Sequence, residues 1–202
     1  MSKEHQKPLV LVLHGPSGVG KDTVIDRLRE RTGIHRATSS TSRPPRPDEQ
    51  HGTHYHFYKR DEFEQKRDAG DFIESALVYD EWKGLERNEI LGPLSAGQDV
   101  IIRTDVQGAR TWRDLIEGAV FVILMAESRD ALRDRLIGRG SEDPESLARR
   151  LAELDEELAD IDNNDYVVMN EQGRVDETVS RLEEIIAKER CDPSRPFPRL
   201  LA

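Results

Sequence analysis

Residues Gly15–Lys21 read GPSGVGK and directly follow an apolar run, PLVLVLH, at Pro8–His14. Three glycines in so short a stretch let backbone N–H groups turn inward around phosphate oxygens, and the lysine can reach the terminal phosphates of a nucleotide. The residues that follow place apolar side chains on one helical face, which predicts a helix from Lys21 to Arg31. A buried strand, a glycine-rich loop and a helix N-terminus in succession favour anion binding, because the helix end presents unpaired N–H groups.

We therefore predict that this loop and the first turn of the helix bind the phosphates of ATP. The predicted ATP-binding residues are Gly15, Pro16, Ser17, Gly18, Val19, Gly20, Lys21, Asp22 and Thr23. In such loops the residue after the lysine is normally Ser or Thr, which ligates Mg²⁺. Here that residue is Asp22, and the hydroxyl comes one place later at Thr23, so both are candidate magnesium ligands. Asp22 could hold the metal through water, or it could repel phosphate until the metal is present.

The remaining apolar runs indicate an α/β fold with a parallel sheet flanked by helices, of the P-loop NTPase type. Val100–Arg103 and Val120–Met125 are apolar enough to be strands buried on both faces, and each precedes a helical pattern. Tyr166–Met169 is a shorter strand candidate, and Val175–Glu189 has the apolar spacing of a helix. Strands that alternate with helices are typical of this fold class.

Two segments depart from this alternation and predict an inserted lobe and a lid. Residues 38–92 begin with a stretch rich in Ser, Thr, Pro and Arg, which indicates a lobe that binds the acceptor substrate. Residues at about 130–158 form a highly charged helical pattern interrupted by glycine and proline, typical of a hinged helical lid. The core would then consist of residues 1–37 and 93–190, and residues 191–202 would form a flexible tail.

The composition limits the classes of partner. The net charge is −10 and 35% of the residues are charged, which argues against broad binding to nucleic acid or to an acidic membrane. The longest apolar stretch, Ala119–Ala126, is far shorter than the ~20 residues of a membrane span. The single cysteine, Cys191, cannot form an internal disulfide, so we expect a soluble cytoplasmic protein that binds small-molecule nucleotides. Monomer and homodimer both stay open.

The stretch Ser39–Glu49 reads SSTSRPPRPDE and continues through Gly52, Tyr55 and Phe57. In these motifs, and along the chain from about residue 8 to residue 190, the sequence resembles the guanylate kinases. The resemblance implies that Arg43, Arg46 and Tyr55 hold the phosphate of the acceptor nucleotide. The chemistry agrees, because planar guanidinium groups bind phosphate oxygens in pairs and the arginine loop shows no matching carboxylate periodicity.

The predicted lid carries a second part of the resemblance, in Arg135, Gly138-Arg139-Gly140 and Arg150. It implies that these arginines close over the nucleotide and stabilise charge on the moving phosphoryl group. The alternative is that each pairs with a nearby carboxylate such as Glu142, Glu145 or Glu153. The predicted catalytic residues are Lys21, Arg43, Arg135, Arg139 and Arg150.

A third signature is Asp105-Val106-Gln107-Gly108, at the end of a predicted core strand. Ligands bind at this end of open α/β sheets, so Asp105 could align an arginine, the acceptor or a metal-bound water. The alternative is an aspartate that only forms a turn.

The residues that read guanine in the family are only partly present. Ser39 and Glu74 are retained, but Arg103 replaces the family's acidic residue and Lys83-Gly84-Leu85 replaces Tyr-Gly-Thr/Ser. Arginine has only donors, so it cannot accept a hydrogen bond from guanine, whereas Lys83 could still serve a phosphate. The predicted acceptor-binding residues are Ser39, Arg43, Arg46, Glu49, Tyr55, Glu74, Lys83, Arg103 and Asp105.

We therefore predict ATP-dependent phosphorylation of a nucleoside monophosphate, with GMP or dGMP as the first choice of acceptor and Mg²⁺ as cofactor. One alternative is another phosphorylated acceptor such as ribose 1,5-bisphosphate, because Lys21-Asp22-Thr23 resembles the corresponding step of ribose 1,5-bisphosphate kinases. An alternative of another class is a non-catalytic guanylate-kinase-like binding module. Such modules typically lack a working phosphate loop, whereas Lys21 and the loop glycines are present here.

Overall fold

A five-stranded parallel sheet forms the core of the computed structural model, which describes residues 7–78, 80–138 and 161–201. Its order is β10-β9-β1-β7-β2, with bounds Tyr166–Met169, Val120–Met125, Val10–His14, Val100–Arg103 and His35–Arg36. All four pairings are parallel. Every residue of β1 and β9 is buried, as expected for strands covered on both faces. The predicted P-loop type of α/β fold and the bounds predicted for β7, β9 and β10 are confirmed.

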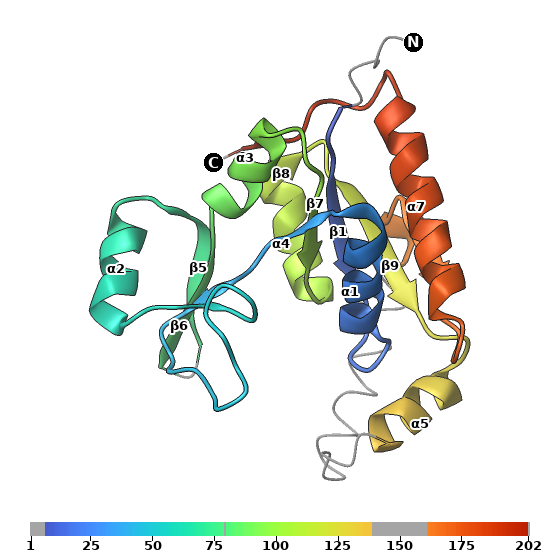
Figure 1. Ribbon diagram of the computed structural model, residues 1–202, viewed down its shortest axis with the longest axis horizontal. Helices are drawn as coiled ribbons and strands as arrows, with labels where there is room; N and C mark the ends of the chain where they lie inside the picture. Colours follow the sequence, from blue (N-terminus) through green and yellow to red (C-terminus); the bar gives the residue numbers. More distant parts are fainter. Residues whose placement is uncertain (1–6, 79, 139–160, 202) are drawn as a thin grey trace.

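Helices cover both faces of this sheet (Figure 1). Helices α1 (Lys21–Thr32) and α7 (Val175–Cys191) lie on one face, and α3 (Asn88–Ser95) and α4 (Val106–Leu115) lie on the other. Each face has its own apolar cluster, with Leu28 and Leu182 in the first and Leu94 and Trp112 in the second. The two clusters fix α1, and therefore the loop before it, against the central strand.

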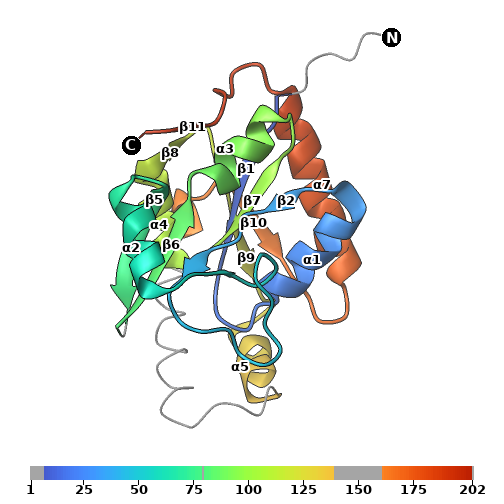
Figure 2. The ribbon, with the colours of Figure 1, turned by 60° about the vertical axis from the view of Figure 1, so that its left-hand side comes forward.

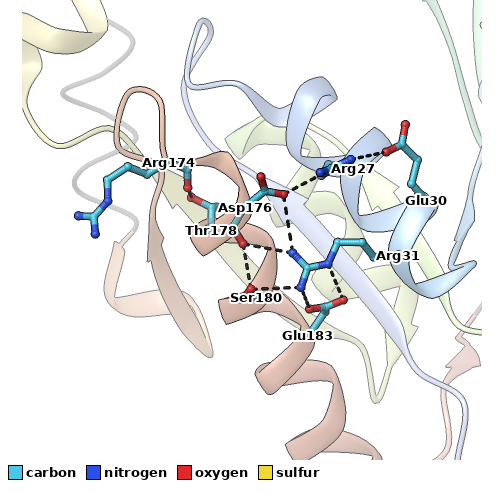
Figure 3. A network of polar contacts seen from close by, with 8 residues as sticks. All are labelled: Arg27, Glu30, Arg31, Arg174, Asp176, Thr178, Ser180 and Glu183. Atoms are coloured by element: carbon cyan, nitrogen blue, oxygen red, sulfur yellow. Dashed lines mark hydrogen bonds and ion pairs between the residues drawn. The ribbon is translucent and has the colours of Figure 1, made fainter.

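Polar contacts hold α1 against α7 along their outer edge (Figure 3). The Arg31 guanidinium donates to both carboxylate oxygens of Glu183, at 3.1 and 2.5 Å, and to the Ser180 hydroxyl at 3.2 Å. One turn earlier, Arg27 Nε donates to Asp176 Oδ1 at 2.9 Å. These are exposed contacts that add to the apolar packing beneath them.

The inserted lobe is a second, smaller sheet with one helix, and it stands beside the core in Figure 1. Its strand order is β4-β3-β6-β5, with bounds His56–Phe57, Ser40–Thr41, Glu81–Glu86 and Phe72–Val78. Helix α2 (Arg60–Asp68) packs on it through Phe63, whose ring stacks on Phe72 at 4.3 Å. The sequence indicated a lobe here but not the β5–β6 hairpin, because both strands are half exposed and lack a clean apolar alternation.

One carboxylate joins the lobe to the core. The oxygens of Glu89, on α3, lie 3.1 Å from Nε2 of His35 on β2 and 2.9 Å from Nε2 of His56 on β4. The Thr38 amide donates to the same carboxylate at 2.7 Å. Burial opposes ionisation of Glu89, but these hydrogen bonds outweigh it and lower its pKa to about 2. Glu89 therefore connects three elements that enter or leave the lobe.

Two predicted boundaries differ from the structure. The division between lobe and core at residues 92 and 93 falls inside α3, whose Ile90 and Leu94 pack in the same apolar cluster as Val100. Helix α3 therefore belongs to the core.

The tail is the second difference, since residues 192–201 follow a defined path along the core. Strand β11 (Arg199–Leu200) pairs antiparallel with β8 (Ile116–Glu117), and the buried Arg195 donates to the carbonyls of Lys7, Pro8 and Glu189. Chain ends are often poorly ordered, which suggested a flexible tail, but here one guanidinium satisfies several backbone carbonyls at once.

Of the predicted lid, the structure describes only its beginning. Helix α5 (Arg129–Gly138) lies beyond the end of β9 in both ribbon views (Figures 1 and 2), and a short helical turn, η1 (Ile161–Asn163), precedes β10. Arg139 and Arg150 lie outside the described residues. In the part of the chain that the structure describes, no helix combines the length and apolar character needed to cross a bilayer.

Candidate functional site

The glycine-rich loop between β1 and α1 has a conformation that only glycine allows at two of its positions. Gly15 has φ 139° and Gly20 has φ 99°, a region that L side chains rarely adopt. A Cβ atom on Gly15 would lie 2.2 Å from the Leu124 carbonyl oxygen, and one on Gly20 would lie 2.7 Å from Nδ2 of Asn170. Between them, the Val19 amide donates to the Pro16 carbonyl at 3.3 Å and closes a turn over Ser17 and Gly18. The backbone therefore forms a tight loop directly before a helix N-terminus.

Lys21 is folded over this loop. Its side chain is buried, and Nζ donates to the carbonyl oxygens of Gly15 at 2.5 Å and of Pro16 at 3.0 Å. The ammonium group is thus held inside the curve of the loop, where phosphate oxygens would stand. Asp22 and Thr23 follow it on the exposed side of the first helical turn.

A buried asparagine supports the loop from behind, and the sequence analysis missed it. Nδ2 of Asn170 donates to the Val19 carbonyl at 2.8 Å, and the Thr178 hydroxyl donates to Asn170 Oδ1 at 2.9 Å. Asn170 is itself buried and directly follows strand β10. A polar residue at the carboxyl end of a core strand was the available signal, because ligands bind at that edge of the sheet.

Arg135 is the one predicted lid arginine within the described residues, and it reaches the same loop. Its guanidinium donates to the carbonyl of Asn170 at 2.9 Å and lies 3.5 Å from the carbonyl of Val19. It also pairs with Glu127 at 2.5 Å, a carboxylate that the sequence analysis had not considered. Arg135 therefore joins α5 to the back of the glycine-rich loop.

Asp22 and Arg103, two of the departures from the family pattern, meet in the structure. Asp22 Oδ1 lies 3.0 Å from Nε of Arg103, at the end of β7. The same oxygen accepts a 2.7 Å hydrogen bond from Nη2 of Arg36, at the end of β2. Arg36 also donates to Asp26 at 3.2 Å. Two strands and one helix thus bring two guanidinium groups to one carboxylate beside the loop.

The arginine loop of the inserted lobe contains its own ion pair. Arg43 donates to both oxygens of Glu49 at 2.6 Å, and the Arg46 amide donates to Glu49 at 2.8 Å. The hydrogen bonds from the Arg43 guanidinium lower the pKa of the Glu49 carboxyl group to about 2. The Arg43 guanidinium also lies over the ring of Tyr55, 5.2 Å from its centroid.

The argument that no carboxylate matches these arginines was therefore wrong for Arg43. The pairing partner lies six positions away in a folded loop, where helical spacing does not apply. Arg46 differs, because its guanidinium is exposed and has no hydrogen-bond or ion-pair partner among the described residues.

The predicted base readers occupy different environments. Glu74, on β5, is half buried, and its carboxylate accepts no hydrogen bond from the described residues; burial raises its pKa. Ser39 is exposed directly before β3, and Lys83 is exposed on β6. Leu85, which we had counted as a lost hydrogen-bonding residue, packs in the apolar cluster of the core.

Asp105 has a structural role in the described state. It is the N-cap residue of α4, and its Oδ1 accepts a hydrogen bond from the Gly108 amide at 2.8 Å. This accounts for the Asp-x-x-Gly signature, since a Cβ on Gly108 would collide with the Thr104 hydroxyl. The other carboxylate oxygen stays exposed at the carboxyl edge of the sheet.

A glycine-rich anion loop on a parallel sheet, a buried lysine within it and an arginine-bearing lobe inserted after β2 define a P-loop phosphotransferase with separate donor and acceptor parts. The family model for guanylate kinase matches residues 5–189. The chain belongs to the guanylate kinase family, as its sequence motifs predicted, and is an ATP-dependent kinase by class.

Individual relatives agree with the family match. Guanylate kinase 2 of rice, a chloroplastic and mitochondrial protein, is 42% identical over 92% of this chain and 66% of its own length. Guanylate kinase of Xylella fastidiosa is 42% identical over 79% of each chain. The crystal structure of guanylate kinase from Anaplasma phagocytophilum superposes with a TM-score of 0.71 and 27% identity, over 94% of this chain and 90% of that one.

Proposed function

We propose that this chain transfers the terminal phosphoryl group of ATP to GMP or dGMP, giving ADP and GDP or dGDP. The observation that carries the proposal is the buried Lys21 inside the glycine-rich loop, in a chain that matches the guanylate kinase family from residue 5 to residue 189. Phosphoryl transfer asks the protein mainly for positioning and for cationic stabilisation, and both are available here.

At the donor end, the phosphate oxygens of ATP would replace the two carbonyl oxygens as the hydrogen-bond acceptors of the Lys21 ammonium group. A phosphate oxygen is the stronger acceptor because it is charged, so the exchange favours the nucleotide. The residues also fit Mg²⁺, because the Thr23 hydroxyl and the second carboxylate oxygen of Asp22 accept no hydrogen bond from the described residues and are ligands of the kind that this ion prefers. When bound, Mg²⁺ supplies positive charge against the donor phosphates.

At the acceptor end, Arg43, Arg46 and Tyr55 would hold the phosphate of the nucleoside monophosphate. The two hydrogen bonds that Arg43 donates to Glu49 orient the Arg43 guanidinium and leave its Nε atom for this phosphate. Arg46 would add the second cation, since its guanidinium has no hydrogen-bond or ion-pair partner among the described residues. Lys83, exposed on β6, could add a third.

Guanine would be read by Glu74 and Ser39. The Glu74 carboxylate can accept hydrogen bonds from the guanine N–H groups, and burial makes an unpaired carboxylate costly until such donors arrive. In this assignment Arg135, together with Arg139 and Arg150, would close the donor side. A cytoplasmic location is part of the same proposal, based on composition and the single cysteine.

The decisive experiment measures ADP release with GMP, dGMP, AMP, UMP and ribose 1,5-bisphosphate in parallel. We expect GMP and dGMP to give the highest kcat/KM. A higher value for ribose 1,5-bisphosphate would replace the proposed acceptor. A protein that releases no ADP with any acceptor, and whose melting temperature ATP and Mg²⁺ do not raise, would instead be a binding module.

A further inference from the structure

The ion pair between Asp22 and Arg103 joins two positions at which this chain departs from its family. Arg103 ends β7, where its Cα faces Leu13 of β1, two residues before the glycine-rich loop. Asp22 directly follows the lysine of that loop and opens the exposed face of α1. The guanidinium of Arg103 is therefore fixed beside the helix N-terminus that receives the donor phosphates.

The contacts of Arg103 leave part of its guanidinium available. The Nε atom pairs with Asp22, and the two terminal nitrogens have no hydrogen-bond partner among the described residues. The side chain is 43% exposed, so these nitrogens can reach a ligand. Strands β7 and β2 also lie on the side of β1 from which the chain enters the acceptor lobe. Arg103 thus stands between the donor loop and the lobe.

The exposure of this pair argues against a purely structural role. Asp22 is shared by Arg36 and Arg103, and Arg36 also pairs with Asp26, so Asp22 is the carboxylate partner of Arg103 alone only in part. Exposed ion pairs contribute little to stability, and in this pair the side chain of Asp22 is 53% exposed and that of Arg103 is 43% exposed. A guanidinium whose terminal nitrogens can reach two phosphates, by contrast, stabilises the charge that spreads over the transferred group.

We infer that Arg103 contacts the phosphoryl group during transfer and that Asp22 is the positioning residue that aims it. This inference rests on the proposed phosphoryl transfer and adds a residue to it. Arg103 donates from its terminal nitrogens to phosphate oxygens. Asp22 stays paired with the Nε atom of Arg103 and so fixes the plane of the guanidinium. The family's acidic reader at this position is thereby replaced by a cation, and guanine discrimination falls to Glu74.

The test is a double-mutant cycle with Arg103→Gln, Asp22→Asn and the double variant, in which kcat and KM are measured for ATP and GMP. We expect Arg103→Gln to lower kcat about 10- to 100-fold with little change in KM for GMP, because the contact forms in transfer. Asp22→Asn should lower kcat about fivefold, as for loss of a partly exposed ion pair. At saturating Mg²⁺, where the Thr23 hydroxyl and the nucleotide can hold the ion without Asp22, the double variant should match Arg103→Gln alone, since Asp22 then acts only through Arg103.

A matched control is the pair between Arg27 and Asp176, which joins the same helix to α7 through the same Nε–Oδ1 contact at 2.9 Å. Arg27→Gln should leave kcat unchanged. Arg103→Lys keeps the charge and should recover part of the kcat lost in Arg103→Gln, which also covers the case that the glutamine variant folds poorly.

Three results would overturn the inference: a kcat for Arg103→Gln within twofold of the unmodified protein, an effect confined to KM, or effects of Asp22 and Arg103 that multiply. An Arg103→Lys variant as slow as Arg103→Gln would do the same. An unmodified chain that does not phosphorylate GMP refutes the proposed function instead, so the two failures are distinguishable.

Discussion

At the scale of single residues, Lys21 carries the donor site, and its burial makes the choice of variant important. Lys21→Met keeps the apolar stem that packs against the loop but removes the ammonium group. We expect kcat to fall about 10²- to 10³-fold, because a charge that stabilises the transferred phosphoryl group is lost. Steady-state ADP release measures this, with Lys59→Met as a control on an exposed lysine of the lobe. Near-normal turnover of Lys21→Met would contradict the donor-site assignment.

Glu74 should determine both guanine specificity and the acid limb of the pH profile. Glu74→Gln should lower kcat/KM for GMP about 10- to 100-fold while changing that for AMP little, because a carboxylate that accepts from guanine is lost. Glu74 accepts hydrogen bonds from guanine in its ionised form, and burial raises the pKa of this carboxyl group. Activity should therefore fall with decreasing pH already above the ordinary value of 4.5.

The pH profile of Glu74→Gln provides the check. It should lack this acid limb, whereas Glu81→Gln, on the neighbouring strand, should keep the limb and the preference for GMP. Equal loss for GMP and AMP in Glu74→Gln would assign the residue a structural role.

The residues of the loop could be predicted from sequence, but their partners could not. Gly15, Gly20 and Lys21 lie next to one another in the chain, and the strand and helix that flank them are visible in the apolar pattern. The pairing of Asp22 with Arg103 depends on the order of strands in the sheet, which brings β7 beside β1. Asn170 comes from the far edge of the same sheet, so no local pattern connects it to the loop.

At the scale of elements, the contacts of Glu89 predict a pH-dependent connection between α3, β2 and β4. The Glu89 pKa is lowered from 4.5 to about 2, so its contribution to stability is present above pH 4.5 and is lost as the pH falls toward 2. Glu89→Gln should lower the free energy of unfolding by about 1–3 kcal/mol at pH 7. The difference from the unmodified protein should close between pH 4.5 and 2.

Urea unfolding at a series of pH values measures this difference. Glu62→Gln, on the exposed face of α2, should differ little from the unmodified protein at any pH. A constant gap for Glu89→Gln down to pH 2 would mean that ionisation of Glu89 does not stabilise the fold.

Three strands that consist of continuous apolar runs were predicted with their bounds, whereas elements of mixed composition were not. The bounds of β7, β9 and β10 follow from continuous apolar runs. Strand β5 is paired with β6 at both ends, with a register shift between Phe72 and Glu74, but its exposed positions carry mixed residues that no period describes. Helix α3 contains Gly92 and Pro93, both weak helix formers, yet its packing on the core keeps it helical.

At the scale of the whole molecule, the carboxyl ends of the parallel strands carry the site and their amino ends carry contacts that stabilise the fold. A variant of Arg195 can test this difference. The loop, Asp22, Arg103 and Asp105 all lie at the carboxyl ends of strands, whereas Arg195 binds carbonyls of Lys7, Pro8 and Gly118 before the amino ends of β1 and β9. It is buried and joins the tail to both segments.

Arg195→Ala should therefore destabilise the protein by about 2–3 kcal/mol, because several buried carbonyls lose a charged donor. For a chain of this size the melting temperature should fall by about 4–12 °C. At temperatures where the variant is folded, kcat for GMP should stay within twofold, since no group at the carboxyl edge moves. Arg199→Ala, which removes an exposed arginine paired with Glu117 in the same tail, should change neither quantity. A loss of kcat in Arg195→Ala without a loss of stability would show that the tail acts on the site rather than on the fold.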